Sequence, residues 1–320
     1  MDLICCEDPS ALTPCSDEYD DAAPLDMDTA IEILVRVIET ESSYPRSIDY
    51  LATVQTHGME AGWRRRVCDW MVNTRKIFDL SPDTVACAVH LMDQCLCVLS
   101  VDKIVLQLVS VMCLSVASKV HENRAISIEE IDLLCQGKYP RAEMVKMEMR
   151  ILETAAWKLN PPSAVGIARD LLALEACSAH GCAVDIPAIE SMVTHLLDAC
   201  LSEYALMPIL ESVKALAALE AVCLTQFHMA SPVVQYVLDE LHFPEHRFHE
   251  CVQVMLEISQ KVFAIGEPHM ENTSSSGGKR HAPTQRSATP TGVDAPQHLI
   301  TTTVARSPSS THIHKKARRG

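Results

Sequence analysis

The sequence predicts an all-α protein made of two tandem five-helix bundles, with one helix before them and disordered termini. Composition is the first observation: glycine occurs 10 times in 320 residues and aromatic residues make up 4%, whereas sheet proteins depend on aromatic residues, threonine and glycine turns. The second observation is an internal repeat, because HLMDQCL at 90–96 returns as HLLDACL at 195–201. A short break and a long Leu/Val/Ala helix follow both copies. We therefore expect two related bundles.

The first helix is expected from Asp28 to about Glu41, with Asp26 or Asp28 as its cap, and the sequence SYPRS ends it. Ser81 is expected to cap a later helix that has Pro82 at its first position. The sequence NPP at 160–162 stops the last helix of the first bundle. Helical patterns of that bundle lie at 60–78, 82–98, 103–120, 127–135 and 141–157.

The second bundle is expected to follow directly after the NPP stop. Its helical patterns lie at 163–176, 186–203, 208–228, 231–241 and 245–263. We therefore divide the chain into a disordered leader, a first helical domain, a second helical domain and a disordered tail, at 1–26, 27–160, 161–264 and 265–320.

Charge is divided unevenly along the chain, whose net charge is −15. Residues 266–320 hold 8 Lys and Arg against 3 Asp and Glu, which leaves 19 against 39 for the rest. An acidic body repels the phosphates of nucleic acid, so we expect no nucleic-acid partner. The basic tail is rich in Ser, Thr, Pro and Gly and has few core-forming residues, a composition that predicts disorder.

The fourteen cysteines predict free thiols and no disulfide framework. Most lie in apolar helical stretches, where cysteine acts as a small hydrophobe, and the sequence has no Cys-x-x-Cys pair. Residues 1–30 are acidic, unlike a signal peptide, so we expect a reducing compartment inside the cell. The longest apolar run, 104–116, is interrupted by Gln107 and two serines and is typical of a core helix, so we expect no membrane contact.

The two copies of the repeat differ at two charged positions. Lys119 ends the apolar stripe of the first bundle, and the matching residue of the second bundle is Leu224. Glu148 lies on the last helix of the first bundle, and its counterpart is Gln253. A charge at the edge of an apolar helix face is costly unless it is paired or used. The alternatives are an ion pair within the bundle, two solvated charges, or a site for a partner.

Three stretches, WRRRVCDWM, SVASKVHE and KMEMRILETAAWKLNPP, resemble the cyclins, as does the two-bundle layout over residues 28–263. The resemblance implies that Lys119 and Glu148, which are 29 residues apart, clamp the backbone of a helix in a cyclin-dependent kinase. An ammonium group binds carbonyl oxygens and a carboxylate accepts from amide groups, both through charge-assisted hydrogen bonds. The resemblance further implies a regulatory subunit that is not an enzyme and has no cofactor or metal of its own.

The stretch LICCE at 3–7 has the pattern Leu-x-Cys-x-Glu within the acidic leader. Ahead of a cyclin-like bundle, it looks like the motif through which D-type cyclins dock retinoblastoma-type pocket proteins. Alternate spacing places Leu3, Cys5 and Glu7 on one face of an extended peptide, with Leu3 and Cys5 in apolar sites and Glu7 against polar donors. A pocket protein is therefore the second expected partner. The alternative is an unstructured end that carries these residues by chance.

The stretch from Trp63 to Val67 departs from the family pattern. Many cyclins have Met-Arg-Ala-Ile-Leu here, which forms an apolar groove for substrate motifs, and Arg66 stands where that groove has isoleucine. This difference argues against substrate docking through the groove and favours the leader motif as the tether. Gln94 also replaces the arginine that usually follows the aspartate in the family.

The tail carries two kinds of candidate signal. Thr289 and Ser307 each precede a proline, the minimal site for a proline-directed kinase, and Thr289 resembles the degradation site in D-type cyclin tails. A compact basic cluster suits the groove of an importin and consists of Lys315, Lys316, Arg318 and Arg319. We therefore expect phosphorylation, an importin partner and a distribution between nucleus and cytoplasm. The alternative is a tail that only confers solubility.

Together these features predict a D-type-like cyclin that activates a cyclin-dependent serine/threonine kinase, recruits pocket proteins and promotes entry into DNA replication. One alternative is a two-bundle general transcription factor or a transcriptional cyclin, which a basic recognition face would indicate. Another is an enzyme with Lys119 and Glu148 as acid and base. The sequence has no HExxH, Cys-x-x-Cys, Gly-rich phosphate loop or nucleophile elbow, which argues against catalysis.

Overall fold

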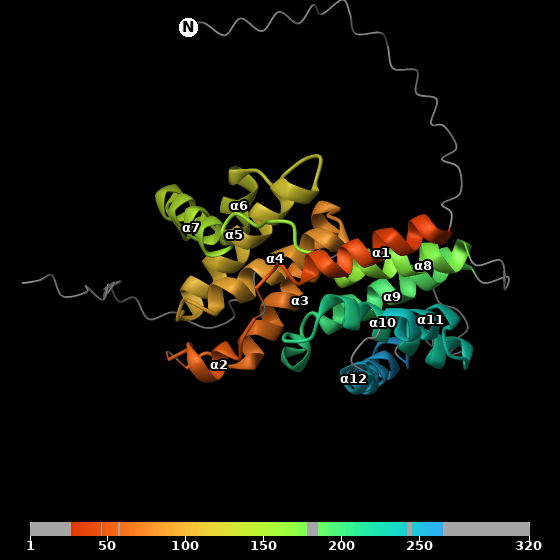
Figure 1. Ribbon diagram of the computed structural model, residues 1–320. Coiled ribbons are helices and arrows are strands. Elements are labelled where there is room, and N and C mark those ends of the chain that lie inside the picture. The colour runs from red at the N-terminus through yellow and green to blue at the C-terminus, as the bar shows by residue number, and fades with distance from the viewer. Residues whose placement is uncertain (1–26, 46, 57, 178–184, 242–244, 265–320) are drawn as a thin grey trace, which may run out of the picture. The chain divides into compact units, whose positions relative to one another are not determined.

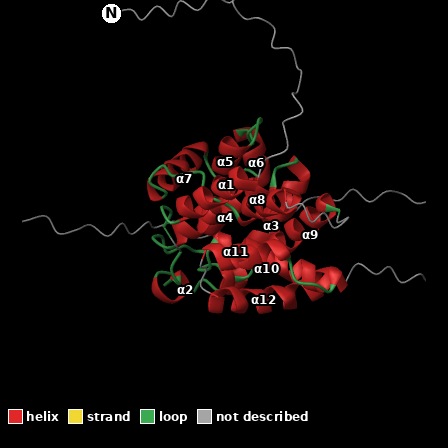
Figure 2. Ribbon diagram, turned by 45° about the vertical axis from the view of Figure 1, so that its right-hand side comes forward, coloured by secondary structure: helices red, strands yellow, loops and turns green. Residues whose placement is uncertain are grey.

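The computed structural model describes residues 27–45, 47–56, 58–177, 185–241 and 245–264. These residues form twelve α-helices joined by loops and short turns, and no strand occurs among them (Figure 2). The all-α fold class predicted from the sequence is therefore confirmed. The expected leader and tail lie outside the described residues.

The first bundle has five helices, preceded by the single-turn helix α2 at Tyr50–Thr53 (Figure 1). The five helices are α3 (Ala61–Phe78), α4 (Pro82–Leu96), α5 (Lys103–His121), α6 (Ile128–Cys135) and α7 (Arg141–Thr154). Helix α5 packs against α4, α6 and α7 at the centre of one apolar core. It is long and apolar enough to cross a membrane by composition, but 72% of that stretch is buried inside the protein. Such burial is typical of a core helix.

The second bundle has its own apolar core. Its helices are α8 (Ala164–Cys177), α9 (Ile186–Cys200), α10 (Glu211–Val222), α11 (Pro232–Leu241) and α12 (Glu245–Ala264). Helix α1, at Met27–Glu41, lies alongside α8 and also contacts α10 (Figure 1). Its buried Ala30 and Leu34 belong to this second core. The helix that the sequence analysis assigned to the first domain thus buries its apolar face in the second bundle.

Local sequence explains where the helices begin. Ser81 accepts a hydrogen bond from the backbone N–H of Thr84 at 3.1 Å, with Pro82 in the first turn, as expected. Ser127 and Glu130 form a reciprocal capping box at the start of α6. These caps satisfy backbone N–H groups that have no partner within their own helix.

Four helices, α4, α7, α9 and α10, end earlier than the sequence predicts, and the cause is visible in two of them. Helix α7 stops at Thr154 because Ala156 and Trp157 adopt left-handed backbone angles, with φ of 47° and 62°, and turn the chain toward the proline pair. Helix α10 gives way to a π-helical turn at Cys223–Phe227. There the hydroxyl of Thr225 donates to the Ala221 carbonyl at 2.7 Å, which tends to bend a helix, and it also meets the Ser259 hydroxyl of α12 at 3.0 Å.

The end of α1 is fastened to the start of α10. The buried carboxylate of Glu41 accepts hydrogen bonds from the backbone N–H groups of Glu211 and Ser212 and from the Ser212 hydroxyl at 2.6 Å. Negative charge is favourable at a helix N-terminus, where these N–H groups lack internal partners. Burial nevertheless raises the pKa of Glu41, and the charge of Glu211 raises it further.

Candidate functional site

Lys119 and Glu148 meet at the surface of the first bundle. Nζ of Lys119, in the last turn of α5, forms an ion pair with Oε1 of Glu148 on α7. The side chains are 46% and 25% exposed, so both remain accessible. The structure therefore brings the two predicted clamp residues together as an ion pair within the bundle.

The end of α5 is held so that Lys119 has little freedom of position. Just before it, the hydroxyl of buried Ser118 donates to the Ser115 carbonyl at 2.8 Å and accepts from the N–H of Ile126 at 3.1 Å. Just after it, the carboxylate of Glu122 accepts from the N–H of Ser81 at 2.7 Å, at the cap of α4. Neighbours on both sides thus fix the last turn of the helix.

Exposed apolar side chains lie close in sequence to the two residues of the ion pair. Val120 follows Lys119 in the chain, and Val145 and Met149 lie on the same helix as Glu148, one turn before it and directly after it. These three are 39%, 50% and 44% exposed, and Trp157, just beyond α7, is 64% exposed. Lys119 has three N–H donors and Glu148 has further acceptor capacity, so the pair can also bind backbone groups of a partner. Exposed apolar side chains together with an accessible charged pair are suited to docking a protein helix.

The stretch expected to form a substrate groove divides into buried and exposed residues. Arg64 is buried, whereas Arg66 is exposed. Trp63 is half-buried, with Nζ of Lys103 4.7 Å from its ring centre. An exposed arginine therefore occupies the position that the family resemblance gives to isoleucine. The Gln94 side chain donates to the Pro45 carbonyl at 2.9 Å and so holds the segment that follows α1.

Sequence reasoning missed a buried ion pair that joins the bundles. Nε and Nη2 of Arg64 donate to both carboxylate oxygens of Asp93 at 2.9 and 2.7 Å, and Tyr50 also donates to Asp93 at 2.8 Å. Nη1 of Arg64 reaches the carbonyl of Leu201 in the second bundle at 2.8 Å. Arg64 therefore holds together one aspartate of the first bundle and one backbone carbonyl of the second.

A second arginine of α3 makes a similar link. Nη2 of Arg75 donates to Asp198 of α9 at 2.6 Å. Asp93 and Asp198 are the fourth residues of HLMDQCL and HLLDACL, so the repeat itself marked both. The available signal was a charged residue retained inside two apolar helices.

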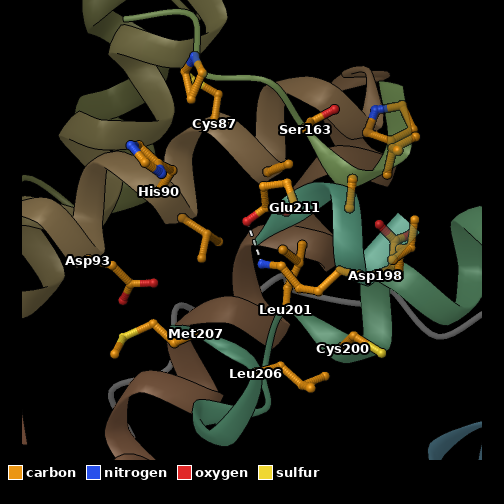
Figure 3. Close-up of a pocket in the computed structure, with 18 of the residues that line it drawn as sticks. Cys87, His90, Asp93, Ser163, Asp198, Cys200, Leu201, Leu206, Met207 and Glu211 are labelled. Atoms are coloured by element: carbon orange, nitrogen blue, oxygen red, sulfur yellow. Dashed lines mark hydrogen bonds and ion pairs between the residues drawn. The ribbon is translucent and has the colours of Figure 1, made fainter. Parts of the chain in front are cut away.

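A small cavity of about 60 Å³ lies between the bundles (Figure 3). His90 and Asp93 line it from α4, and Glu211 and Lys214, which form an ion pair, line it from α10. Burial lowers the pKa of His90, although the charges of Glu211 and Asp93 oppose this shift. His90 therefore favours its neutral form at this junction.

Disulfides, reactive thiols and metal sites would indicate other kinds of chemistry in the described residues. All ten cysteines among them are free thiols, and burial raises the pKa of Cys68 to about 12. No group of three His, Cys, Asp or Glu side chains in the described ranges is placed to hold a metal ion.

Several predicted site residues lie outside the described residues. These are the leader motif residues, the two candidate phosphorylation sites and the basic cluster, namely Leu3, Cys5, Glu7, Thr289, Ser307, Lys315, Lys316, Arg318 and Arg319. Their roles stay predictions.

Known proteins resemble this chain most clearly across its first bundle. Residues 32–160 match the family model described as "Cyclin, N-terminal domain". Cyclin-A1-2 of Arabidopsis thaliana is 25% identical over 265 residues, which are 80% of this chain and 58% of that protein. Cyclin-A2-2 of the same plant is 28% identical over 170 residues, 53% of this chain and 38% of that protein. The chain spans about half the length of the curated relatives it matches.

A solved structure of a viral cyclin from herpesvirus saimiri has the same fold. The two superpose with a TM-score of 0.61 at 16% identity, over 73% of this chain and 100% of that one. The described residues therefore have the tandem cyclin fold that the sequence predicted. The reported relatives are A-type, so the D-type resemblance and the leader motif stay predictions.

Proposed function

We propose that this chain is a cyclin, a non-enzymatic regulatory subunit that binds and activates a cyclin-dependent serine/threonine kinase. The observation that carries the proposal is the Lys119–Glu148 ion pair, which is accessible at the surface of the first bundle within the residues that match the cyclin N-terminal domain. Before docking, some backbone groups of the kinase helix bond to water. In the complex, Lys119 and Glu148 replace that water. Binding then favours the active one of two kinase conformations.

The test is to remove the clamp from the full-length chain and measure kinase binding. Lys119→Ala, Glu148→Ala and the double variant should each abolish co-precipitation of a purified cyclin-dependent kinase. Losing one partner of a desolvated charge pair costs about 2–5 kcal/mol. Circular dichroism should show unchanged helical content, because both side chains lie at the surface.

The matched control is a second ion pair on α7, the helix that carries Glu148. Lys146 and Glu143 are 72% and 51% exposed and 2.8 Å apart. The double variant Lys146→Ala with Glu143→Ala should bind the kinase like the parent chain. Normal kinase binding by the Lys119/Glu148 double variant would contradict the proposal.

A D-type role is the finer proposal, supported by the sequence of the leader. In it, Leu3, Cys5 and Glu7 tether a retinoblastoma-type pocket protein, which raises the local concentration of substrate and promotes entry into DNA replication. Cys5→Gly combined with Glu7→Lys should abolish pull-down by a purified pocket domain and lower phosphorylation of that protein. Phosphorylation of a short peptide and binding of the kinase should not change. Retained pocket-domain binding would exclude this role and leave the kinase proposal intact.

The tail supports a proposal about turnover and location. We assign Thr289 and Ser307 as sites for a proline-directed kinase and the basic cluster from Lys315 to Arg319 as a signal for importin-dependent entry into the nucleus. Thr289→Ala should lengthen the half-life of the protein in cells. Replacing the four basic residues with alanine should shift the protein toward the cytoplasm.

A further inference from the structure

Glu122 directly follows α5 and ends that helix in an extended conformation, with φ of −106° and ψ of 144°. Its backbone N–H still donates to the carbonyl of Ser118 at 3.0 Å, so it closes the same turn that carries Lys119. Glu122 is three residues beyond Lys119, which is less than one turn of an α-helix. Any bond that holds Glu122 therefore also restrains Lys119.

The side chain of Glu122 is bound to the start of α4. Its Oε1 accepts hydrogen bonds from the backbone N–H of Ser81 at 2.7 Å and from the hydroxyl of Thr84. Ser81 is the cap of α4, and Thr84 is 0% exposed. The backbone N–H of a cap residue has no acceptor within its own helix, so a carboxylate there makes a charge-assisted hydrogen bond. The side chain thus ties the end of α5 to the start of α4.

The start of α4 is itself held from the other side. Asp83, in the first turn of α4, accepts hydrogen bonds from the hydroxyl of Ser163 and from Nη2 of Arg169 on α8. A negative charge in the first turn is also favourable for α4. Glu122 is therefore bound to a helix start that the second bundle keeps in place.

The second bundle has the same fastening without the clamp. Glu220, near the end of α10, accepts a hydrogen bond from the backbone N–H of Ser231 at 2.9 Å. Ser231 and Ser81 are both followed by proline at the start of a helix. The residue that matches Lys119 is Leu224, however, so this copy carries the bond without the lysine.

We infer that Glu122 is a positioning residue for the clamp: its carboxylate fastens the last turn of α5 to the start of α4 and so holds Lys119 in place for the kinase. The inference deepens the proposed function and rests on it, because it takes Lys119 as the residue that binds the kinase. A side chain that is already in place loses less conformational freedom on binding. Without the bond, the last turn should fray and the affinity for the kinase should fall about 3- to 30-fold.

The position of Lys119 can be measured without the kinase. A carbodiimide joins an amine to a carboxylate only where the two are in contact, so mass spectrometry of the treated full-length chain should find Lys119 linked to Glu148. Glu122→Ala should lower the yield of this link. The link between Lys146 and Glu143, which are 2.8 Å apart on α7, is the internal standard and should not change. An unchanged Lys119–Glu148 yield in Glu122→Ala would overturn the inference.

Kinase affinity, measured by titration with a purified cyclin-dependent kinase, is the second readout. Glu122→Ala should weaken it, and Glu122→Gln should restore most of it, because the amide oxygen of glutamine also accepts hydrogen bonds. Thr84→Val removes one donor to Glu122 and should cause a smaller loss of affinity and of link yield. Thr84 is buried, so its loss cannot be a lost contact with the kinase. If Glu122→Gln binds as weakly as Glu122→Ala, the charge of Glu122 matters instead of its bond, and the inference fails.

Glu220→Ala is the matched control for lost stability. It removes the same kind of bond at Ser231 and should lower the free energy of unfolding, but kinase affinity and the Lys119–Glu148 link should not change. An equal loss of affinity in Glu220→Ala would indicate a general loosening of the fold and contradict a positioning role. The link yields decide the inference even if the parent chain binds no kinase, a result that would overturn the proposed function alone.

Discussion

Asp93 and Asp198 occupy the same position in the two copies of the repeat, yet their surroundings differ. Asp93 accepts three hydrogen bonds within 2.9 Å, two from Arg64 and one from Tyr50. Asp198 accepts one from Arg75 at 2.6 Å and borders an open groove. Both arginines come from α3, 11 residues apart and so about three turns along one face. Both copies of the repeat have a buried aspartate at this position, but the hydrogen-bond donors around the two aspartates differ.

The comparison shows what a buried charge needs in order to be purely structural. A carboxylate and a guanidinium in the interior repay their desolvation only when their remaining donors and acceptors are also satisfied. The Arg64–Asp93 pair meets this condition, whereas the Arg75–Asp198 pair does not among the described residues. The first is a completed link between the bundles, and the second leaves one buried nitrogen without an acceptor among the described residues.

The largest effect is expected from breaking the complete pair. Asp93→Asn leaves the buried Arg64 without its counter-charge, and such a loss costs about 3–5 kcal/mol. Urea unfolding followed by circular dichroism would measure it. Arg64→Met should cost a similar amount, because it leaves Asp93 as the uncompensated charge.

A smaller effect is expected at the incomplete pair. Asp198→Asn removes one charge-assisted hydrogen bond, which contributes about 1.5–3 kcal/mol. Burial also raises the pKa of Asp198, so the substitution relieves part of the cost of keeping that carboxylate charged. Urea unfolding of Asp93→Asn and Asp198→Asn under the same conditions compares their losses in the free energy of unfolding. A loss as large as that of Asp93→Asn would contradict the distinction between the two pairs.

The smallest effect concerns pH at the cavity between the bundles. Burial lowers the pKa of His90, whose neighbours are the Tyr44 ring, Glu211, Asp93 and Lys214. The unfolded chain therefore takes up a proton at higher pH than the folded chain, and stability should fall as pH drops below about 6.5, the ordinary histidine value. His90→Gln should reduce that slope in unfolding experiments between pH 7 and about 5.

A second histidine provides the control for this experiment. Burial also lowers the pKa of His121, at the end of α5, so His90→Gln should remove only part of the slope. The double variant with His121→Gln should remove more. If the slope is unchanged in both variants, other groups govern the pH dependence.

Sequence alone was sufficient for most of the architecture. Helix caps such as Ser81 and the proline pair after α7 act locally, so their effects can be recognised without a fold. The early end of α10 was missed because a bond between the hydroxyls of Thr225 and Ser259, at 3.0 Å, accompanies the π-helical turn. Residues that are 34 positions apart meet only after the bundle has formed.

The candidate site was also predictable only in part, because sequence spacing identifies some of its residues and the fold determines the rest. The spacing of Lys119 and Glu148 identified them through the family resemblance, and the fold then placed them in contact. The chemistry of Arg64 does not separate it from Arg65 and Arg66, but its helical spacing does, because the buried Val67, Cys68 and Met71 follow it by three, four and seven residues on one face. Helix α3 packs against α4 and α5 in the fold.

The bond between Glu41 and the start of α10 has a consequence for how the chain is made. The carboxylate and the Ser212 hydroxyl are 171 residues apart. At a synthesis rate of about 5–20 residues per second, roughly 10–30 seconds pass between their emergence from the ribosome. During that time Leu34 and the rest of the apolar face of α1 have no second bundle to cover them. The first bundle is free to fold in this interval, whereas α1, although it is made first, cannot form its contacts with α8 and α10 until those helices have been made.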